Sequence, residues 1–258
     1  LAGFTGAVQR LDRAVGTVLD ALEDCGLADN TIVAFTSDHG VDFPRAKGTL
    51  YDLGIRTALI MRHPNGFAGG RQCGELTSHV DILPTLCDAC GLPPVPGIQG
   101  VSLLPLVHGE REGQRKQIVA EESTCPRNLM RCLRTSQYKV IHNSFPGEFS
   151  NAWIMPGAPL LADAGGSYAV TIPECELYDV VADPDESTNL ADLPEMRPVR
   201  DELEAQLLQW RRETDDPLLT GTIQRPANEA EIISNLPPFF TQNPDYRARA
   251  GLDVPGDA

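Results

Sequence analysis

An acid, an imidazole and an amine lie within ten residues of one another in the segment FTSDHGVDFPRAKG, residues 35–48. Asp38 could bind a hard cation such as Ca²⁺, Mg²⁺ or Mn²⁺ through its carboxylate oxygens. A nitrogen from His39 suits Mn²⁺ or Zn²⁺ better than Ca²⁺. Lys47, on the loop that follows, could reach back to an anionic group held by such a cation. The other interpretation is a turn at a strand end, in which Asp38 caps local N–H groups and Lys47 is solvated. Spacing alone leaves both open.

The elements around this segment predict where it lies in the fold. Residues 31–35 and 58–61 are short, continuously apolar runs, as expected for strands that are covered on both faces. A helix is predicted before them and another at 80–90. Helix, buried strand, loop, buried strand and helix form the pattern of an α/β sheet. Because ligands of open α/β sheets bind at the carboxyl ends of strands, Asp38 stands in a favourable place. The apolar face of the first helix is Phe4, Val8, Leu11, Val15, Val18, Leu19 and Leu22.

The second half of the chain has a different pattern. Residues 117–121, 129–143 and 176–181 are strand-like, and the middle segment is long enough to fold as a hairpin at Ser136. An amphipathic helix closes this part, with Val199, Leu203, Leu207 and Trp210 on one face. We therefore expect three parts. These are an α/β portion at 1–110, a small antiparallel α+β subdomain at 111–216, and an extended tail at 217–258.

Composition limits the class of partner. The 258 residues include 21 Lys and Arg against 36 Asp and Glu, so the formal charge of −15 argues against nucleic acid or an anionic membrane as a partner. An anionic small substrate remains compatible, because a few local cations can dominate a pocket. No run approaches the roughly 18 apolar residues of a membrane span. The seven cysteines show no disulfide spacing. Both a bacterial cytoplasm and a periplasm are compatible with this count.

Two of the cysteines form a Cys-x-x-Cys pair that could be half of a metal or redox site. Cys87 and Cys90 share a helical spacing with Val80 and Leu83. We therefore expect both thiols to face an apolar core.

Several motifs, in order, resemble one enzyme family. FTSDHG at 35–40 with KGTLYDLGIR at 47–56 resembles the second signature region of sulfatases of the alkaline-phosphatase superfamily. VDILPTL at 80–86 and GVSLLPL at 100–106 resemble the segments that follow it. Later motifs are MRCLRT at 130–135, YKVIHN at 138–143, ELYD at 176–179 and DPDESTNL at 183–190. This set is most similar to the heparan N-sulfatases, which are sulfamidases. The resemblance implies part of an alkaline-phosphatase-like sheet with flanking helices.

The resemblance also implies a chemistry. Sulfatases hold a divalent cation, usually Ca²⁺, with two early aspartates and a later pair that Asp38 and His39 match. His39 stands where many members have Asn, which makes Mn²⁺ a competitor. Lys47 matches a position at which members of the family carry a lysine or arginine that contacts the sulfate. The nucleophile is a formylglycine made from the Cys of a Cys-x-Pro/Ala-x-Arg motif, and no cysteine of this chain lies in one.

The missing nucleophile and the missing early aspartates imply a C-terminal portion of a sulfatase. We expect such a portion to be inactive alone, to expose strand edges and apolar faces, and to be poorly soluble or dependent on a partner. That partner would be the missing N-terminal half of the same protein, and a homo-oligomer is also possible. The expected substrate is a sulfated sugar or another sulfated small molecule.

Other residues are weaker candidates. Arg45 could add positive potential for a sulfated substrate, although a solvated loop arginine is the simpler interpretation. His79 could line the cleft or cap the helix after it. Arg131 and Arg134 could contribute to specificity, and the turn from Asp183 to Glu186 is interpreted as structural. Two other functions stay open: a phosphonate monoester or phosphodiester hydrolase of the same superfamily, and a non-catalytic binding module.

Overall fold

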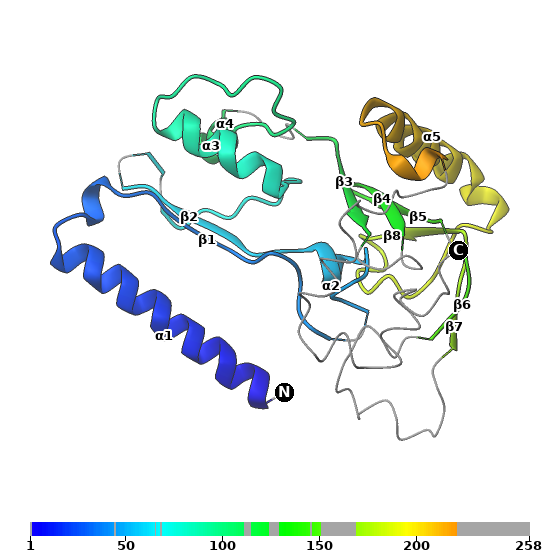
Figure 1. Cartoon of the computed structure of the whole chain (residues 1–258), viewed down its shortest axis with the longest axis horizontal. Coiled ribbons are helices and arrows are strands. Elements are labelled where there is room, and N and C mark those ends of the chain that lie inside the picture. The colour runs from blue at the N-terminus through cyan, green and yellow to red at the C-terminus, as the bar shows by residue number, and fades with distance from the viewer. Residues whose placement is uncertain are drawn as a thin grey trace, which may run out of the picture. The chain divides into compact units, whose positions relative to one another are not determined.

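The computed structural model describes residues 2–43, 45–64, 66–67, 69–110, 115–123, 129–144, 146–150 and 169–220 (Figure 1). The chain forms two compact units, each described by itself below. The first holds Leu1–Asp38 and Thr57–Arg115, and the second holds His39–Arg56 and Lys116–Ala258. Most of the expected tail, residues 221–258, lies outside the described residues, as do residues 151–168 of a loop rich in Pro, Gly and Ala. The expected division of the chain near residue 110 stays a prediction.

The first unit contains a long helix, a pair of strands and two short helices. Strands β1 and β2 pair antiparallel, with Val33 opposite Arg62 and Thr36 opposite Leu59. Both strands were expected, but neither contains a buried residue, and Ile60 is 64% exposed. The expectation that they are covered on both faces is therefore wrong for this chain, because no described segment packs over them deeply enough to bury a residue. The elements are α1 (Ala2–Asp24), η1 (Ala28–Asn30), β1 (Val33–Thr36), β2 (Leu59–Arg62), η2 (His79–Asp81), α3 (Ile82–Ala89) and α4 (Leu104–His108).

Apolar side chains of this unit are largely exposed. Helix α1 has the predicted amphipathic pattern, yet it contains no buried residue. On η2 and α3, Val80 is 45% and Leu83 is 52% exposed, and Cys90 is exposed while Cys87 is half-buried. The expectation that both thiols face a core is therefore wrong for Cys90. The periodicity correctly marks an apolar face, but that face has no deep cover within the described residues.

A buried aspartate connects several segments of this unit. Asp81 is fully buried and accepts the N–H groups of Ser78 at 2.8 Å and Val101 at 2.9 Å. Arg115 forms an ion pair with the same carboxylate. Ser78 and Asp81 together form a capping box at the start of η2. These bonds tie the beginning of the helix to the segment at residue 101.

The second unit is built on a four-stranded antiparallel sheet in the order β3-β4-β5-β8. The predicted hairpin is confirmed, because β4 and β5 pair with Cys132 opposite Ile141. The closing helix is confirmed as α5. The elements are α2 (Asp52–Ile55), β3 (Gln117–Glu122), β4 (Met130–Thr135), β5 (Tyr138–Asn143), β6 (Gly147–Ser150), β7 (Ala169–Ile172), β8 (Cys175–Asp179), η5 (Pro194–Met196), α5 (Arg197–Glu213) and η6 (Pro217–Thr220).

Two different segments cover the two faces of this sheet. On one face, Leu133 and Val140 pack with Leu203 and Leu207 of α5. Figure 1 shows α5 beside this sheet. On the opposite face, side chains of β4, β5 and β8 pack around Leu50, which is only 3% exposed. Alternation along a strand explains this division, since successive side chains point to opposite faces. The segment that carries Lys47 is thus attached to the sheet of the second unit.

None of the described helices has the length and apolar character that crossing a bilayer requires.

Candidate functional site

Asp38 and His79 belong to the first unit. Asp38 lies two residues after β1 ends and is exposed. Thr36, the last residue of β1, donates its hydroxyl proton to the carbonyl of Ala58 at 2.8 Å. Nε2 of His79 lies 3.1 Å from the same hydroxyl oxygen. Because that hydroxyl proton is used, the imidazole is the donor, and His79 is held at the carboxyl end of β1.

One ring nitrogen of His39 contacts the main chain. Its Nδ1 lies 2.8 Å from the carbonyl oxygen of Gly40. A carbonyl oxygen can only accept, so Nδ1 carries a proton. Donation of one ring N–H to a backbone carbonyl is the usual way in which a metal-binding imidazole is oriented. A Cβ on Gly40 would overlap the carbonyl of Leu53, so glycine is required where the chain turns after His39.

The donor set around this segment is small. The described residues contain no group of three or more His, Cys, Asp or Glu side chains able to hold a metal ion. Asp38 and His39 offer one carboxylate and one imidazole, a set that suits Mn²⁺ and, through the oxygens, Ca²⁺. A cation bound here would therefore take further ligands from other groups.

Lys47 and Arg45 lie in the second unit with His39. Lys47 is exposed, and its main-chain N–H donates to the carbonyl of Val41 at 3.1 Å. The Arg45 guanidinium donates to the main-chain oxygen of Glu186 at 2.5 Å, and its Cζ lies 4.2 Å from the ring centroid of Tyr51. These contacts make Arg45 an anchor of the loop. Its assignment as a substrate-binding residue stays a prediction.

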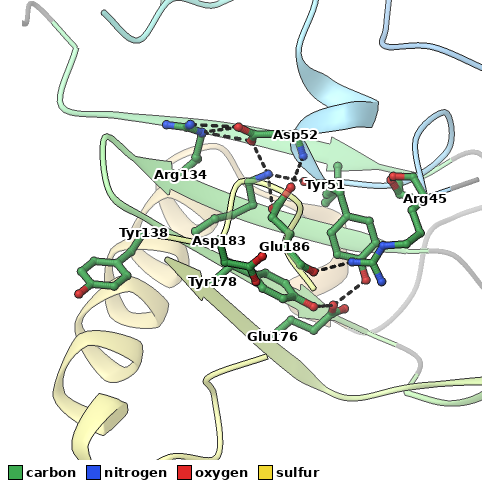
Figure 2. Close-up of polar contacts among 12 residues, drawn as sticks. Arg45, Tyr51, Asp52, Arg134, Tyr138, Glu176, Tyr178, Asp183 and Glu186 are labelled. Carbon is green, nitrogen blue, oxygen red and sulfur yellow. Dashed lines mark hydrogen bonds and ion pairs between the residues drawn. The ribbon is translucent and has the colours of Figure 1, made fainter. Parts of the chain in front are cut away.

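A buried charged cluster adjoins this loop (Figure 2). The side chain of Lys139, on β5, is 0% exposed. Its Nζ lies 2.5 Å from Oδ1 of Asp52 and 2.7 Å from Oε1 of Glu186. The same ammonium group donates to the carbonyl of Leu50 at 3.1 Å. Lys139 thus joins the loop, the sheet and the turn at residue 186.

The two carboxylates of this cluster differ in their pKa. Burial raises the pKa of Glu186 above its ordinary value, although the charge and hydrogen bond of Lys139 oppose the shift. Burial also favours the neutral form of Asp52. Hydrogen bonds and charges from Arg134 and Lys139 outweigh that effect and hold the pKa of Asp52 below its ordinary value. Asp52 is therefore the more firmly ionised partner of Lys139.

A second group of hydrogen-bonded polar side chains, centred on the carboxylate of Glu176, lies on the same face of the sheet (Figure 2). Glu176 is buried and accepts the hydroxyls of Tyr51 at 2.7 Å and Tyr178 at 2.6 Å, together with the amide of Asn143 at 2.9 Å. Burial, and then the charge of Glu176, raise the pKa of both tyrosines. Both phenols are therefore fixed donors, and Tyr51 ties the loop to β8.

The two arginines proposed for specificity have structural partners. Arg131 is 2% exposed and binds Asp216 through Nε at 3.1 Å and Nη2 at 3.0 Å. Arg134 donates to Asp52 at 3.0 Å. The turn after β8 is structural, as expected, because the Asp183 carboxylate accepts the N–H groups of residues 187 and 188 at 2.8 Å.

The sequence interpretation assigned no role to Lys139 or Asp52, and it treated Glu186 only as part of a structural turn. These residues contact one another across long distances in the sequence. Asp52 and Glu186, for example, are hydrogen-bonded although they lie 134 positions apart. A signal was nevertheless present in β5. Lys139 and Ile141 lie on one face of a strand, and a lysine on the same face as an apolar core residue requires a buried carboxylate partner.

The chain is similar in sequence to known sulfatases. A family model described as Sulfatase matches residues 1–92. An ulvan-active sulfatase of Formosa agariphila is 31% identical in an alignment of 221 residues that covers 79% of this chain and 36% of that protein. Human N-sulphoglucosamine sulphohydrolase is 29% identical in an alignment of 246 residues that covers 84% of this chain and 48% of that protein. The chain thus spans about a third to a half of the length of these relatives.

Solved structures agree on the fold. An enzyme solved in complex with its substrate D-glucosamine-2-N,6-O-disulfate is 28% identical, with a TM-score of 0.61 over 81% of this chain and 40% of that one. A phosphonate monoester hydrolase of Agrobacterium radiobacter is 26% identical, with a TM-score of 0.62 over 80% of this chain and 40% of that one. The expected α/β class, with its additional antiparallel sheet, is confirmed.

Proposed function

Because this chain carries a sulfatase-family domain and resembles sulfatases along most of its length, we propose that it is the C-terminal portion of a metal-dependent sulfatase. Its reaction is the hydrolysis of sulfate esters or N-sulfate groups on a sugar. The observation that carries this proposal is the pair of Asp38 and His39, in which Nδ1 of His39 is bound to the Gly40 carbonyl, so Nε2 is the ring nitrogen through which His39 would bind a cation.

Each candidate residue has a role in this proposal. Asp38 and His39 are ligands of a divalent cation, with Ca²⁺ as the first candidate and Mn²⁺ as its competitor. When bound, such a cation supplies positive charge that stabilises the sulfate oxygens in the transition state. Lys47 adds a second positive charge on the same oxygens. Arg45 keeps Lys47 in place, and His79 lies at the end of the strand that leads to Asp38.

The nucleophile belongs to another part of the protein. No cysteine of this chain lies in the motif that is converted to formylglycine. The chain alone is therefore inactive, and its partner is the N-terminal half of a longer protein. The exposed apolar side chains of α1 and β2 support this proposal, since a helix face with Leu11 52% exposed and a strand with Ile60 64% exposed are surfaces that another segment would bury.

The names of two similar proteins support the proposed substrate class. One matching protein is described as N-sulphoglucosamine sulphohydrolase and another was solved with a sulfated glucosamine. Both names describe sulfated amino sugars, so a sulfated sugar is the first substrate to test, with N-sulfoglucosamine as the specific candidate.

The test uses the longer protein encoded around this chain, expressed together with a formylglycine-generating enzyme. Sulfate release from N-sulfoglucosamine is measured with added Ca²⁺ or Mn²⁺. We expect activity that Asp38→Asn and Lys47→Ala each reduce by about 100-fold or more, as the loss of one electrostatic stabiliser does. Activity that is unchanged in both variants would contradict the site. Steady sulfate release by the present chain alone would contradict its assignment as an inactive portion.

A phosphonate monoester hydrolase is the second candidate, because such an enzyme of Agrobacterium radiobacter has the same fold over 80% of this chain. The same assay separates the two functions when a phosphonate monoester replaces the sulfated sugar. Turnover of the phosphonate with no sulfate release would favour the second candidate. Failure of both substrates, with a cation bound, would favour a binding module.

A further inference from the structure

One residue holds both ends of the loop that carries Lys47. At the first end, the Arg45 guanidinium donates to the main-chain oxygen of Glu186 at 2.5 Å. At the second end, the N–H of Asp52 donates to Oε2 of Glu186. Lys47 lies between these two anchors. Glu186 is 2% exposed, so the acceptor of both bonds is a buried residue (Figure 2).

Lys139 completes this attachment from the sheet. A lysine ammonium group has three N–H donors. Here Nζ donates to the carbonyl of Leu50 and forms ion pairs with the carboxylates of Asp52 and Glu186. Leu50 and Asp52 belong to the loop. Because Lys139 is fully buried, loss of the Glu186 charge would leave its ammonium group poorly compensated and weaken this attachment of the loop.

The loop backbone between the anchors is fixed, while the side chain of Lys47 is exposed. Ala46 is 0% and Leu50 is 3% exposed, and Leu50 packs in the core beside the sheet. The hydroxyl of Thr49 donates to the carbonyl of Ala46 at 2.6 Å. An exposed amine on a rigid backbone suits electrostatic catalysis, which requires charges placed before the reaction.

The conformation of Glu186 is itself special. Its φ of 51° lies in the left-handed region, which residues other than glycine, asparagine and aspartate seldom adopt. The Asp183 carboxylate stabilises this turn by accepting the N–H groups of Ser187 and Thr188. The turn thus directs the carbonyl and the carboxylate of Glu186 toward one loop, and such costly conformations persist where the surroundings require them.

We propose that Glu186 is a positioning residue, which holds residues 45–52 so that Lys47 is presented to a sulfate group. This inference rests on the function proposed above, since contact between Lys47 and sulfate belongs to that function. Glu186 itself touches no substrate and acts through the loop.

The first experiment measures hydrogen exchange of the chain in Glu186→Gln, a variant that keeps the size of the side chain and removes its charge. We expect the N–H groups of Lys47 and Thr49 to exchange about tenfold faster than in the wild type, while β4 and β5 keep their protection. The matched control is Asp216→Asn, which alters another buried carboxylate of the same unit without touching the loop. Unchanged loop exchange in Glu186→Gln, or an equal increase in Asp216→Asn, would overturn the positioning role.

The second experiment titrates the same variants with inorganic sulfate and follows the Lys47 amide by NMR. We expect the wild type and Asp216→Asn to bind alike, Glu186→Gln to bind about tenfold more weakly, and Lys47→Ala to lose the response. Sulfate affinity that is unchanged in Glu186→Gln despite a loosened loop would reduce Glu186 to a structural residue. Absent binding by the wild type, or equal binding by Lys47→Ala, would instead contradict the assignment of Lys47 in the proposed function.

Discussion

The two units of this chain use their apolar residues in opposite ways. In the first unit, Leu103 is the one buried large apolar residue among the residues described, whereas Leu11, Ile60 and Leu83 are each more than half exposed. In the second unit, two apolar clusters cover both faces of a sheet, and arginine and lysine side chains are buried with carboxylate partners. Both units contain amphipathic elements, but only the second one buries them.

The two units are therefore stabilised by different kinds of interaction. The first unit is held by short-range bonds, such as the capping box of Ser78 and Asp81, and by the pairing of two strands. The second unit is held by burial of side chains from segments far apart in the chain. Because burial of apolar surface is the dominant stabilising term in folding, the second unit should dominate the measured stability. The loop with Lys47 is attached to this better-packed unit.

The largest expected effect in this comparison comes from Lys139→Ala. Removal of the ammonium group leaves the buried carboxylate of Glu186 and the half-buried carboxylate of Asp52 without their shared cation. This costs about 3–5 kcal/mol of unfolding free energy. The measurement is urea unfolding followed by the fluorescence of Trp210 on α5, in a Trp153→Phe background. The control is Lys116→Ala, an exposed lysine of the same unit, which should stay within about 0.5 kcal/mol of the wild type. Equal effects of the two variants would show that the buried cluster adds no stability.

A leucine substitution in each unit gives the next effect. Leu133 is 0% exposed and Leu11 is 52% exposed. Leu133→Ala should therefore lower the unfolding free energy by about 2–5 kcal/mol. Leu11→Ala should change it by no more than about 0.5 kcal/mol. The same urea titration measures both. A large loss in Leu11→Ala would mean that α1 packs more deeply than the structure shows and would end the contrast between the units.

Local patterns in the sequence predicted most elements, and the reason is that these elements carry their own periodicity. The helix of residues 2–24 and the β4–β5 hairpin were expected from apolar spacing and are present. The short helices α2 and α4, and the strand pair β6–β7, have too few residues for a period to stand out. Antiparallel pairing of β1 with β2 was not foreseen either, because a short apolar run indicates a strand without indicating its partner or the direction of pairing.

The candidate site was predictable only as far as it is local. Asp38, His39 and Lys47 lie close in sequence, so motif and resemblance could find them, and their roles stay predictions. The anchors of the loop come from β5 and from the turn at residue 186. No local pattern reports which distant carboxylate a lysine will meet. The lysine in β5 was the one visible sign that such a partner exists.

Acid should weaken the second unit through Asp216. Burial favours the neutral form of this carboxyl group, but hydrogen bonds from Arg131, the Leu218 N–H and Arg211 outweigh it and hold the pKa of Asp216 below its ordinary value. The stabilising contribution is therefore fully present above the unfolded pKa of about 3.9 and is lost as the pH falls through the lower folded value. Thermal unfolding between about pH 6 and pH 2.5 should show this loss.

The variant Asp216→Asn isolates that contribution. It should cost about 1.5–3 kcal/mol at neutral pH, because hydrogen bonds to two charged guanidinium groups are weakened. It should also make the fall in stability below about pH 4 less steep than in the wild type. Parallel pH profiles for the two proteins would mean that another carboxylate dominates the acid response.

The smallest effect in this chain is expected for Ile60→Thr on β2. Ile60 is 64% exposed, and threonine is also favoured in strands, so the unfolding free energy should change by less than about 0.5 kcal/mol. The same substitution in the longer protein should cost about 1 kcal/mol or more, if the proposed N-terminal half covers β2, because a buried hydroxyl then replaces apolar surface. Comparison of the two unfolding titrations measures the difference directly. Equal costs in the chain and in the longer protein would show that β2 stays exposed there, and the apolar face of the first unit would then need a different partner.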